Sequence, residues 1–198
     1  MIDAGYFMFA SIFSYAKRKD YPPTFTALRM MIGNLKRVGI RPDDLVIIAV
    51  DSKKGSWRKD VDPAYKANRK ESREKHDIDW KKHFEEFNDL YERLDGGTPF
   101  HVINIEKLEA DDTIAFSCRY FKDRECIIIS VDADYEQLVA FPNVKLFSPI
   151  SKRYKKVKNP YAVLASKIRK EQADNLITEI HTELDYEKRE KIVNLLRL

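Results

Sequence analysis

The sequence predicts an α/β fold in which a mostly parallel central sheet carries helices on both faces. Two observations lead to this fold class. Short apolar runs alternate along the chain with segments whose apolar residues recur at helical spacing, as expected of parallel strands joined by helices. Four of the apolar runs also give way to acidic residues at their carboxyl ends. In an open α/β sheet those ends lie together, where ligands bind.

The first half of the chain is expected to begin with a short strand over residues 2–3. Aromatic and small residues then favour a helix over 5–15. Thr24 follows two prolines and is the expected N-cap of a helix over 25–38, in which apolar residues recur at helical spacing. A glycine ends this helix, and the apolar run 45–50 is the next expected strand. Because the first strand is unusually short, an upstream extension of the chain is expected.

The second half of the chain repeats this alternation. One face of the segment 80–94 is apolar, which predicts a helix that Gly96-Gly97 closes, followed by a strand over 100–105. The remaining expected elements, in chain order, are a helix over 109–121, a strand over 126–131, a short helix over 135–139, a strand over 144–147, a basic edge strand or hairpin over 151–158, a helix that Pro160 begins and that ends near residue 170, and an amphipathic helix over 183–198.

The composition indicates a globular protein of one large domain, or of one domain with a small appendage. The chain has 198 residues, of which 43% are hydrophobic. Cys118 and Cys126 lie in apolar segments without zinc spacing, so we interpret them as small buried side chains in a reducing compartment. No apolar run approaches the roughly 20 residues that span a membrane, and the N-terminus lacks a signal-peptide pattern. We therefore expect a cytoplasmic protein without membrane contact.

Residues 52–82 differ from the rest of the chain because they contain almost no aliphatic side chains. Trp57, Tyr65 and Trp80 are interleaved there with many basic residues. Charge runs are most often solvated surface, but aromatic and basic residues together also suit a strip that contacts phosphates and stacks bases. The net charge is only +4, yet an acidic cluster at one site would leave the remaining surface basic, which suits a polyanionic substrate. The segment directly follows Asp51 and is expected to lie over that strand end.

The candidate site consists of carboxylates at the ends of predicted strands. Asp132 and Asp134 share one face of an extended segment, and Glu109 and Asp112 share one face of a helix. So many carboxylates cannot all stay ionised at neutral pH without compensation. Divalent cations are the natural compensation, and oxygen ligands select Mg²⁺ or Mn²⁺ over zinc. Two such ions roughly 4 Å apart can support phosphodiester hydrolysis. The candidate acids are Asp3, Asp51, Glu109, Asp111, Asp112, Asp132 and Asp134.

No competing catalytic arrangement is visible in the sequence. The four histidines are scattered, and no Ser/His/Asp or Cys/His grouping appears. A glycine-rich dinucleotide loop and a Walker pattern are also missing, which disfavours the familiar uses of this fold for nucleotide cofactors. Each acid alone could cap a turn or lie in a loop, so the prediction of a site depends on all of them falling at strand ends.

Five motifs, in this order, resemble the flap endonuclease/5′-3′ exonuclease family and look most like its bacteriophage branch. The resemblance runs from residue 3 to about residue 175. The motifs are Val50-Asp51, Trp57-Arg58-Lys59-Asp60, Pro63-Ala64-Tyr65-Lys66-Ala67-Asn68-Arg69, Glu109-Ala110-Asp111-Asp112 and Ser130-Val131-Asp132-Ala133-Asp134. The resemblance implies a PIN-like nuclease fold over residues 1–158, a helical arch at about 52–82, and two Mg²⁺ ions that Mn²⁺ can replace. It also implies hydrolysis at 5′ flaps and 5′ ends of DNA and RNA–DNA hybrids, as in flap processing and primer removal during replication.

The resemblance further implies residue roles, position by position. Asp51 and Asp132 would take part in catalysis as metal ligands, while Lys66 and Arg69 would contact the scissile phosphate. The implied metal ligands, direct or through water, are Asp3, Asp51, Glu109, Asp111, Asp112, Asp132, Asp134 and, near the C-terminus, Asp174. The expected nucleic-acid contacts are Arg58, Tyr65, Lys66, Arg69, Lys70, Lys152, Arg153, Lys155 and Lys156.

The chain departs from the family after its basic run 152–158. The family's helix–hairpin–helix-like module, with a Gly-Asp…Asp-Asn signature, is reduced to a short helical module over 159–198. Asp174 matches the last acid of that signature, and Glu171 takes the place of the earlier one. This leaves open how the duplex is held, although the basic run is expected to supply part of the phosphate contact. Two explanations stay open: the chain is truncated at Leu198, or it is a naturally minimal nuclease.

The prediction from the sequence is therefore a metal-dependent 5′ nuclease. Its expected partners are branched or 5′-ended DNA and RNA–DNA hybrids, with a single-strand DNA-binding protein as a further candidate, and it is expected to be a monomer. A phage-encoded protein would act in the host cytoplasm. One alternative is a PIN-type single-strand endoribonuclease, which the long basic segment disfavours. The other is a non-catalytic branched-DNA-binding protein, which the intact set of carboxylates disfavours.

Overall fold

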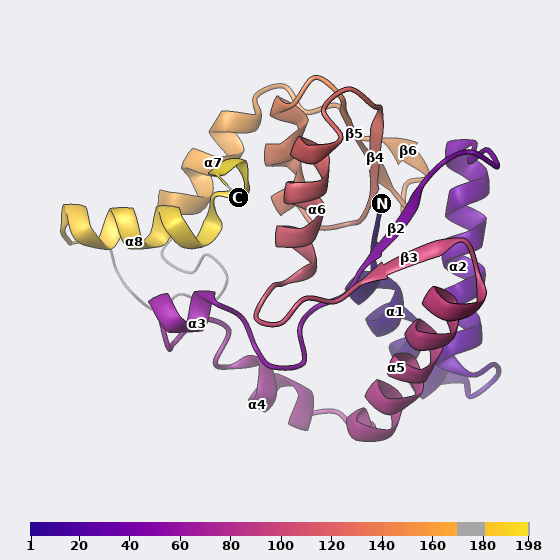
Figure 1. The fold of residues 1–198 in the computed structure, drawn as a ribbon. Helices are drawn as coiled ribbons and strands as arrows, with labels where there is room; N and C mark the ends of the chain where they lie inside the picture. Colours follow the sequence, from indigo (N-terminus) through magenta and orange to yellow (C-terminus); the bar gives the residue numbers. More distant parts are fainter. Residues whose placement is uncertain (170–180, 198) are drawn as a thin grey trace.

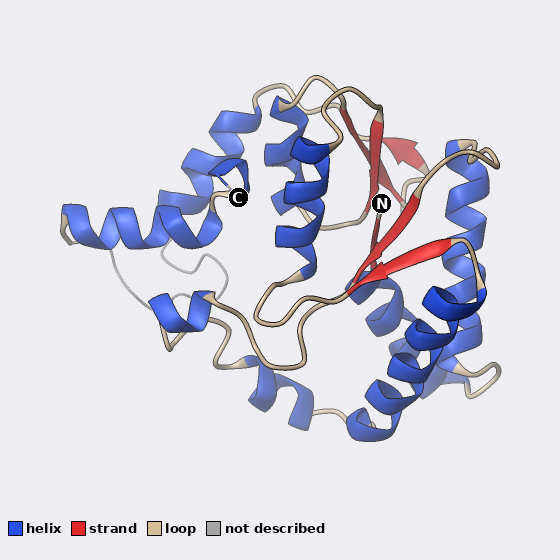
Figure 2. Ribbon diagram, viewed as in Figure 1, coloured by secondary structure: helices blue, strands red, loops and turns tan. Residues whose placement is uncertain are grey.

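A six-stranded sheet with the order β3-β2-β1-β4-β5-β6 forms the centre of the structure (Figure 1, Figure 2). This computed structural model describes residues 1–169 and 181–197. Strands β1 to β5 pair in parallel, and only β6 runs antiparallel, against β5. The predicted fold class, a mostly parallel sheet with helices on both faces, is confirmed. The strands are β1 (Ile2–Asp3), β2 (Val46–Ala49), β3 (Phe100–Ile103), β4 (Cys126–Ile129), β5 (Val144–Ser148) and β6 (Arg153–Tyr154).

The helices form two layers, one on each face of the sheet, together with segments at its carboxyl edge and at the C-terminus. The first layer contains α1 (Ala4–Arg18), α2 (Pro23–Val38) and α5 (Trp80–Gly97), and the second contains α6 (Ala110–Tyr120) and the 3-10 helix η1 (Asp134–Ala140). The other helices are α3 (Arg58–Val61), α4 (Arg69–Glu74), α7 (Pro160–Arg169), α8 (Glu183–Val193) and the 3-10 helix η3 (Leu195–Arg197). No described helix is long and apolar enough to cross a membrane.

The strands separate two hydrophobic cores because successive side chains of a strand point to opposite faces. Ile48 of β2 and Ile129 of β4 pack into the core under α1, α2 and α5. The neighbouring residues Ala49 and Ile128 pack into the core under α6 and η1. All four are almost completely buried. Burial on both faces explains why these strands read as continuous apolar runs rather than as alternating ones.

Two predicted helix caps are wrong, and the helix predicted over 183–198 ends at Val193, followed by η3. Thr24 does not cap α2: the helix begins at Pro23, two residues before the predicted start, because the fixed φ of proline suits the first helical position and its missing N–H costs nothing there. Gly96 and Gly97 do not close α5 but form its last residues. Thr98 caps the helix instead, with its backbone N–H donating to the carbonyl of Leu94. Glycine costs a helix roughly 1 kcal/mol, which the buried apolar face of α5 offsets.

The basic segment between β2 and α5 lies at the carboxyl edge of the sheet and contacts the C-terminal helices. Figure 1 shows α3 and α4 near the start of α6, where β1, β2 and β3 end. Tyr65 of this segment packs with Ile168 of α7 and with Ile192 and Val193 of α8. The C-terminal helices therefore pack on the rest of the described structure, and the predicted boundary at residue 158 stays a prediction. Cys118 and Cys126 are buried and free, as predicted.

Candidate metal centre at the carboxyl edge of the sheet

Three carboxylates from three neighbouring parallel strands form the centre of the site. Asp3 is the last residue of β1, Asp51 follows β2, and Asp132 follows β4. Each accepts a hydrogen bond from a neutral donor: Asp3 Oδ2 from Ser130 Oγ at 2.9 Å, Asp51 Oδ1 from the backbone N of Ala110 at 2.8 Å, and Asp132 Oδ1 from the backbone N of Asp134 at 2.9 Å. None of the three forms an ion pair with a described residue. No cation of the described residues therefore compensates their negative charge.

The electrostatics of Asp3 show that these three carboxylates act on one another. The pKa of Asp3 is raised to about 6, mainly by burial, and the charges of Asp51 and Asp132 contribute to this shift. The hydrogen bonds from Ser130 and from the backbone of Gly5 oppose this shift. Carboxylates that raise one another's pKa in this way are typical of a site that binds a cation.

A second group of acids surrounds Arg58, at the start of α6. The Arg58 side chain is only 1% exposed. Its Nη1 donates to Asp112 Oδ2 at 2.8 Å and to Glu109 Oε2 at 3.2 Å, and its Nη2 lies 3.3 Å from Asp111 Oδ1. The Nε donates to the carbonyl of Ile192 in α8 at 2.8 Å. One guanidinium thus joins the acidic start of α6 to the C-terminal helix.

Glu109 and Asp111 differ in how well this guanidinium compensates them. Glu109 Oε2 also accepts from Lys66 Nζ at 2.9 Å and from the Tyr65 hydroxyl at 2.9 Å. Burial would raise the pKa of Glu109, but the charges of Lys66 and Arg58 hold it below its ordinary value. Burial raises the pKa of Asp111 to about 8 despite Arg58, and Asp112 and Glu109 add to the shift. The site therefore still contains more acid than the described cations balance.

Two predicted ligands remain, Asp134 and Asp174. Asp134, the first residue of η1, forms an ion pair with Lys167 of α7. Asp174 and the suggested replacement Glu171 fall in residues 170–180, outside the part of the chain that the structure describes. The role of Asp174 as a ligand stays a prediction.

The predicted nucleic-acid contacts fall into buried and exposed groups. Arg58 and Tyr65 face the acids and the C-terminal helices in this conformation, so their predicted contacts require this segment to open and stay predictions. Arg69 at the start of α4 is exposed, whereas Lys66 is half-buried on Glu109. The side chain of Lys70 lies outside the described part of the structure.

The predicted basic strand forms β6, at the same edge of the sheet as the acids. Arg153 pairs with Ser148, the last residue of β5, because the two strands are antiparallel. Lys152, Arg153 and Lys156 are exposed, and Lys155 donates to Glu136 Oε1 at 3.0 Å. A positive strip thus begins beside the carboxyl ends of the parallel strands.

The chemistry of the donors fits a divalent cation. Three uncompensated carboxylates offer only oxygen, the ligand that Mg²⁺ and Mn²⁺ prefer. Among residues 1–169 and 181–197, no group of three or more acidic, histidine or cysteine side chains is already arranged to hold a metal ion. The buried Oδ1 atoms of Asp111 and Asp112 accept no aligned hydrogen bond, although both carboxylates are paired with Arg58. Binding of an ion would therefore require the carboxylate side chains to rearrange. The Oδ1 atoms of Asp111 and Asp112 accept no hydrogen bond that such a rearrangement would break.

Three residues of the site were not predicted from the sequence. Ser130 holds Asp3 and also accepts from the backbone N of Asp132 at 3.1 Å. Trp57 donates from its indole N–H to Asp112 Oδ2 at 3.1 Å. Ser130 and Trp57 belong to the motifs that resemble the family, so their positions could have indicated that they lie at the site. Lys167 has no such sequence signal.

We expect the metal-free protein to lose stability as pH rises from 5 to 8. The folded-state pKa values of Asp3 and Asp111, about 6 and about 8, lie above the ordinary value of 3.8. For groups shifted in this direction the folded state binds more protons, so the stability they contribute at low pH is lost as pH rises through the folded pKa. The expected loss is roughly 1 kcal/mol from Asp3 and up to roughly 4 kcal/mol from Asp111, measured by urea denaturation in EDTA. Asp3→Asn should flatten the decline, and a decline of the same size in that variant would contradict the assignment.

Comparisons with known proteins agree with this geometry. The sequence matches the family model described as 5′-3′ exonuclease, N-terminal resolvase-like domain, over residues 1–180. It is 36% identical over 129 residues to Ribonuclease H of Enterobacteria phage T4, a match that covers 64% of this chain and 42% of that protein. The chain thus matches less than half the length of this relative.

Solved structures with the same fold include two from phage T5. The T5 5′-exonuclease with bound zinc ions superposes with a TM-score of 0.71 at 18% identity, over 99% of this chain and 85% of that one. The phage T5 flap endonuclease, in a pseudo-enzyme-product complex with DNA and metal ions, superposes with a TM-score of 0.70 at 20% identity, over 98% of this chain and 75% of that one.

Proposed function

The chain belongs to the 5′-3′ exonuclease family, through the N-terminal resolvase-like domain of that family, and we propose that it is a divalent-metal-dependent 5′ nuclease. Its substrates are 5′ flaps and 5′ ends of DNA and of RNA–DNA hybrids. The observation that carries the proposal is the set of uncompensated carboxylates at the ends of three parallel strands, Asp3, Asp51 and Asp132. The relative from phage T4 is named as a ribonuclease, and one solved relative holds DNA. Both names support a nucleic-acid substrate.

Asp3, Asp51 and Asp132 would hold Mg²⁺ directly or through water, and Glu109, Asp111, Asp112 and Asp134 would complete the site. Mn²⁺ is expected to replace Mg²⁺, since both prefer oxygen ligands. When bound, two such ions would supply charge stabilisation to the phosphate and a nucleophilic water at neutral pH. Asp174 is proposed as a further ligand from the C-terminal module.

The protein's own residues position the substrate and keep the carboxylates in place. Ser130 fixes one oxygen of Asp3, and the start of α6 fixes one oxygen of Asp51 through the Ala110 N–H. Lys66 has a left-handed backbone conformation, with φ of 53°, and its ammonium lies at the rim of the acidic centre on Glu109. On substrate binding this ammonium would exchange Glu109 for a phosphate oxygen. Arg69, exposed one turn further along, would take the neighbouring phosphate.

The duplex is proposed to lie along the positive strip of β6. Lys152, Arg153 and Lys156 are exposed there, at the carboxyl edge that carries the acids. Contacts to phosphates fix the register of a nucleic acid without reading its sequence, which suits a nuclease that recognises a 5′ structure. A single-strand DNA-binding protein stays a proposed partner, and the monomeric state stays a proposal.

The proposal is tested by cleavage of 5′-labelled flap, nicked and RNA–DNA substrates with Mg²⁺, with Mn²⁺ and with EDTA. We expect cleavage near the 5′ end or flap junction with either metal and none in EDTA. Cleavage of single-stranded RNA but not of a DNA flap would indicate a PIN-type endoribonuclease instead. Tight flap binding without metal-dependent turnover would indicate a non-catalytic binding protein.

A further inference from the structure

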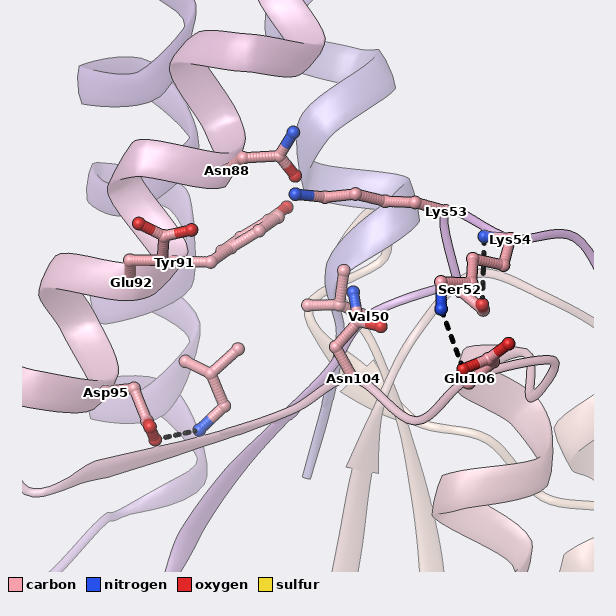
Figure 3. Close-up of a pocket in the computed structure, with 11 residues that line it drawn as sticks. Val50, Ser52, Lys53, Lys54, Asn88, Tyr91, Glu92, Asp95, Asn104 and Glu106 are labelled. Atoms are coloured by element: carbon pink, nitrogen blue, oxygen red, sulfur yellow. Dashed lines mark hydrogen bonds and ion pairs between the residues drawn. The ribbon is translucent and has the colours of Figure 1, made fainter.

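A pocket of about 430 Å³ opens beside the acidic centre, between α5 and the segments that follow β2 and β3 (Figure 3). Val50 and Ser52, which flank Asp51, line one wall, and Val102 of β3 lines another. The volume lies within the roughly 300–1,000 Å³ of small-molecule sites. The site described above uses none of the polar groups of this pocket, so they have no assigned role.

Tyr91 of α5 lines this pocket and directs its hydroxyl toward the side-chain ends of Lys53 and Asn88 (Figure 3). The residue is only 7% exposed, and its hydroxyl has no hydrogen-bond partner among the residues that the structure describes. Burial raises the pKa of Tyr91, and the charges of Asp3 and Asp51 add to the shift. A buried hydroxyl without a partner costs roughly 1–3 kcal/mol, and such groups are rare in native structures. The unpartnered hydroxyl therefore points to a ligand that completes its hydrogen bonding.

The other unengaged polar groups of the pocket suit a nucleotide. Lys53 and Asn88 form no side-chain hydrogen bond or ion pair with a described residue, and Figure 3 shows their polar ends next to the Tyr91 hydroxyl. One cation, one amide and one hydroxyl thus converge on the same space. Glu92 also lines the pocket, but its carboxylate points away from Lys53 (Figure 3).

Apart from Lys53 and Glu92, the charged groups of the pocket already have partners. Lys54 Nζ lies 2.9 Å from Glu106 Oε2, and Asp95 Oδ1 accepts from the backbone N of Val102 at 2.9 Å. Lys53 is therefore the cation available for a phosphate, and the walls formed by Val50 and Val102 are apolar enough to lie against a base.

We propose that this pocket binds one nucleotide of the substrate strand, next to the phosphodiester that is cleaved. Lys53 contacts the phosphate of this nucleotide, and Asn88 and Tyr91 hydrogen-bond to its base or sugar. The inference rests on the proposed nuclease function, because it takes the ligand to be part of that substrate. It adds a subsite that selects the nucleotide beside the cut.

The test measures binding of labelled 5′-flap DNA by fluorescence anisotropy with Ca²⁺ in place of Mg²⁺, so that binding is read without turnover. Each nucleotide around the flap junction is replaced in turn by an abasic residue. We expect one position at which the abasic residue weakens binding to the wild-type protein by about 5-fold to 10-fold. The same replacement should have no further effect on Tyr91→Phe or Asn88→Ala. An abasic effect of the same size in these variants, or no sensitive position at all, would overturn the subsite.

Two controls separate the subsite from general charge and from misfolding. Lys53→Ala should weaken flap binding and lower the slope of log Kd against log salt by about one, whereas Lys54→Ala, whose ammonium is paired with Glu106, should change little. Equal losses in the two variants would contradict the proposed role of Lys53. The Tm of Tyr91→Phe should not fall, because the lost hydroxyl has no partner in the free protein. If the wild-type protein cleaves flaps and only the subsite predictions fail, the subsite is wrong and the proposed nuclease function stands. If the wild-type protein does not bind flap DNA, the subsite and the proposed function are both overturned.

Discussion

Replacing Asp132 and Asp134 together by Asn is expected to reduce flap cleavage by about 10³-fold or more. Asp132 is one of three carboxylates that no described cation compensates, and its Oδ1 accepts from the backbone N of Asp134. Asn keeps the shape of each side chain but removes the negative charge that holds a divalent ion. Bound metal supplies several kcal/mol to phosphoryl chemistry, and each 1.36 kcal/mol is a factor of ten in rate. The measurement is the single-turnover rate on a 5′-labelled flap duplex with saturating Mg²⁺.

The matched control for this prediction is Asp123→Asn. Asp123 is exposed between α6 and β4, away from the carboxyl edge, and its variant should cleave at the wild-type rate. The double variant should stay folded with a Tm slightly below that of the wild type, because Asp132 is exposed but Asp134 loses its ion pair with Lys167. Undiminished cleavage by the folded double variant would remove Asp132 and Asp134 from the catalytic site.

Replacing Arg58 by Ala is expected to destabilise the metal-free protein by about 3–5 kcal/mol. The change leaves Glu109, Asp111 and Asp112 as buried acids without their main cation and removes the hydrogen bond to the carbonyl of Ile192. Loss of one partner from a buried ion pair costs this much because the other charge stays buried and unpaired. The measurement is the free energy of unfolding from urea denaturation in EDTA.

A surface ion pair provides the comparison for Arg58. Arg93 lies 2.9 Å from Asp89 on the exposed side of α5, and Arg93→Ala should cost less than about 1 kcal/mol. If the acids at the start of α6 also bind metal, Mn²⁺ should stabilise Arg58→Ala more than it stabilises the wild type. Destabilisation no greater than that of Arg93→Ala would show that Arg58 is not the cation that stabilises this cluster.

The sheet and the clustering of its strand-end carboxylates could both be predicted from the sequence, for one physical reason. Parallel strands buried on both faces must be apolar throughout, so their lengths and their ends are visible as runs that stop at Asp. Asp3, Asp51 and Asp132 follow such runs, and the structure brings all three to the carboxyl edge. Acids on different strands could be placed together without any knowledge of side-chain contacts.

The partners of these acids could not be predicted in the same way. Arg58 and Glu109 are 51 residues apart, and Arg58 and Ile192 are 134 residues apart. Such contacts depend on how the segment after β2 packs against α6 and α8, which no local pattern encodes. Tyr65 illustrates the same limit, since an aromatic residue in a basic segment suits base stacking, yet its ring is buried against the C-terminal helices.

The most direct test of the central claim is a calorimetric titration of Mn²⁺ into the metal-free protein at pH 7.5, with the wild type and Asp132→Asn/Asp134→Asn compared side by side. The claim is that the strand-end carboxylates bind the divalent ions on which cleavage depends. We expect saturable binding to the wild type, accompanied by proton release because Asp111, with a pKa of about 8, must lose its proton. At least one binding site should be lost in the double variant. Equal binding isotherms for the two proteins would contradict the account.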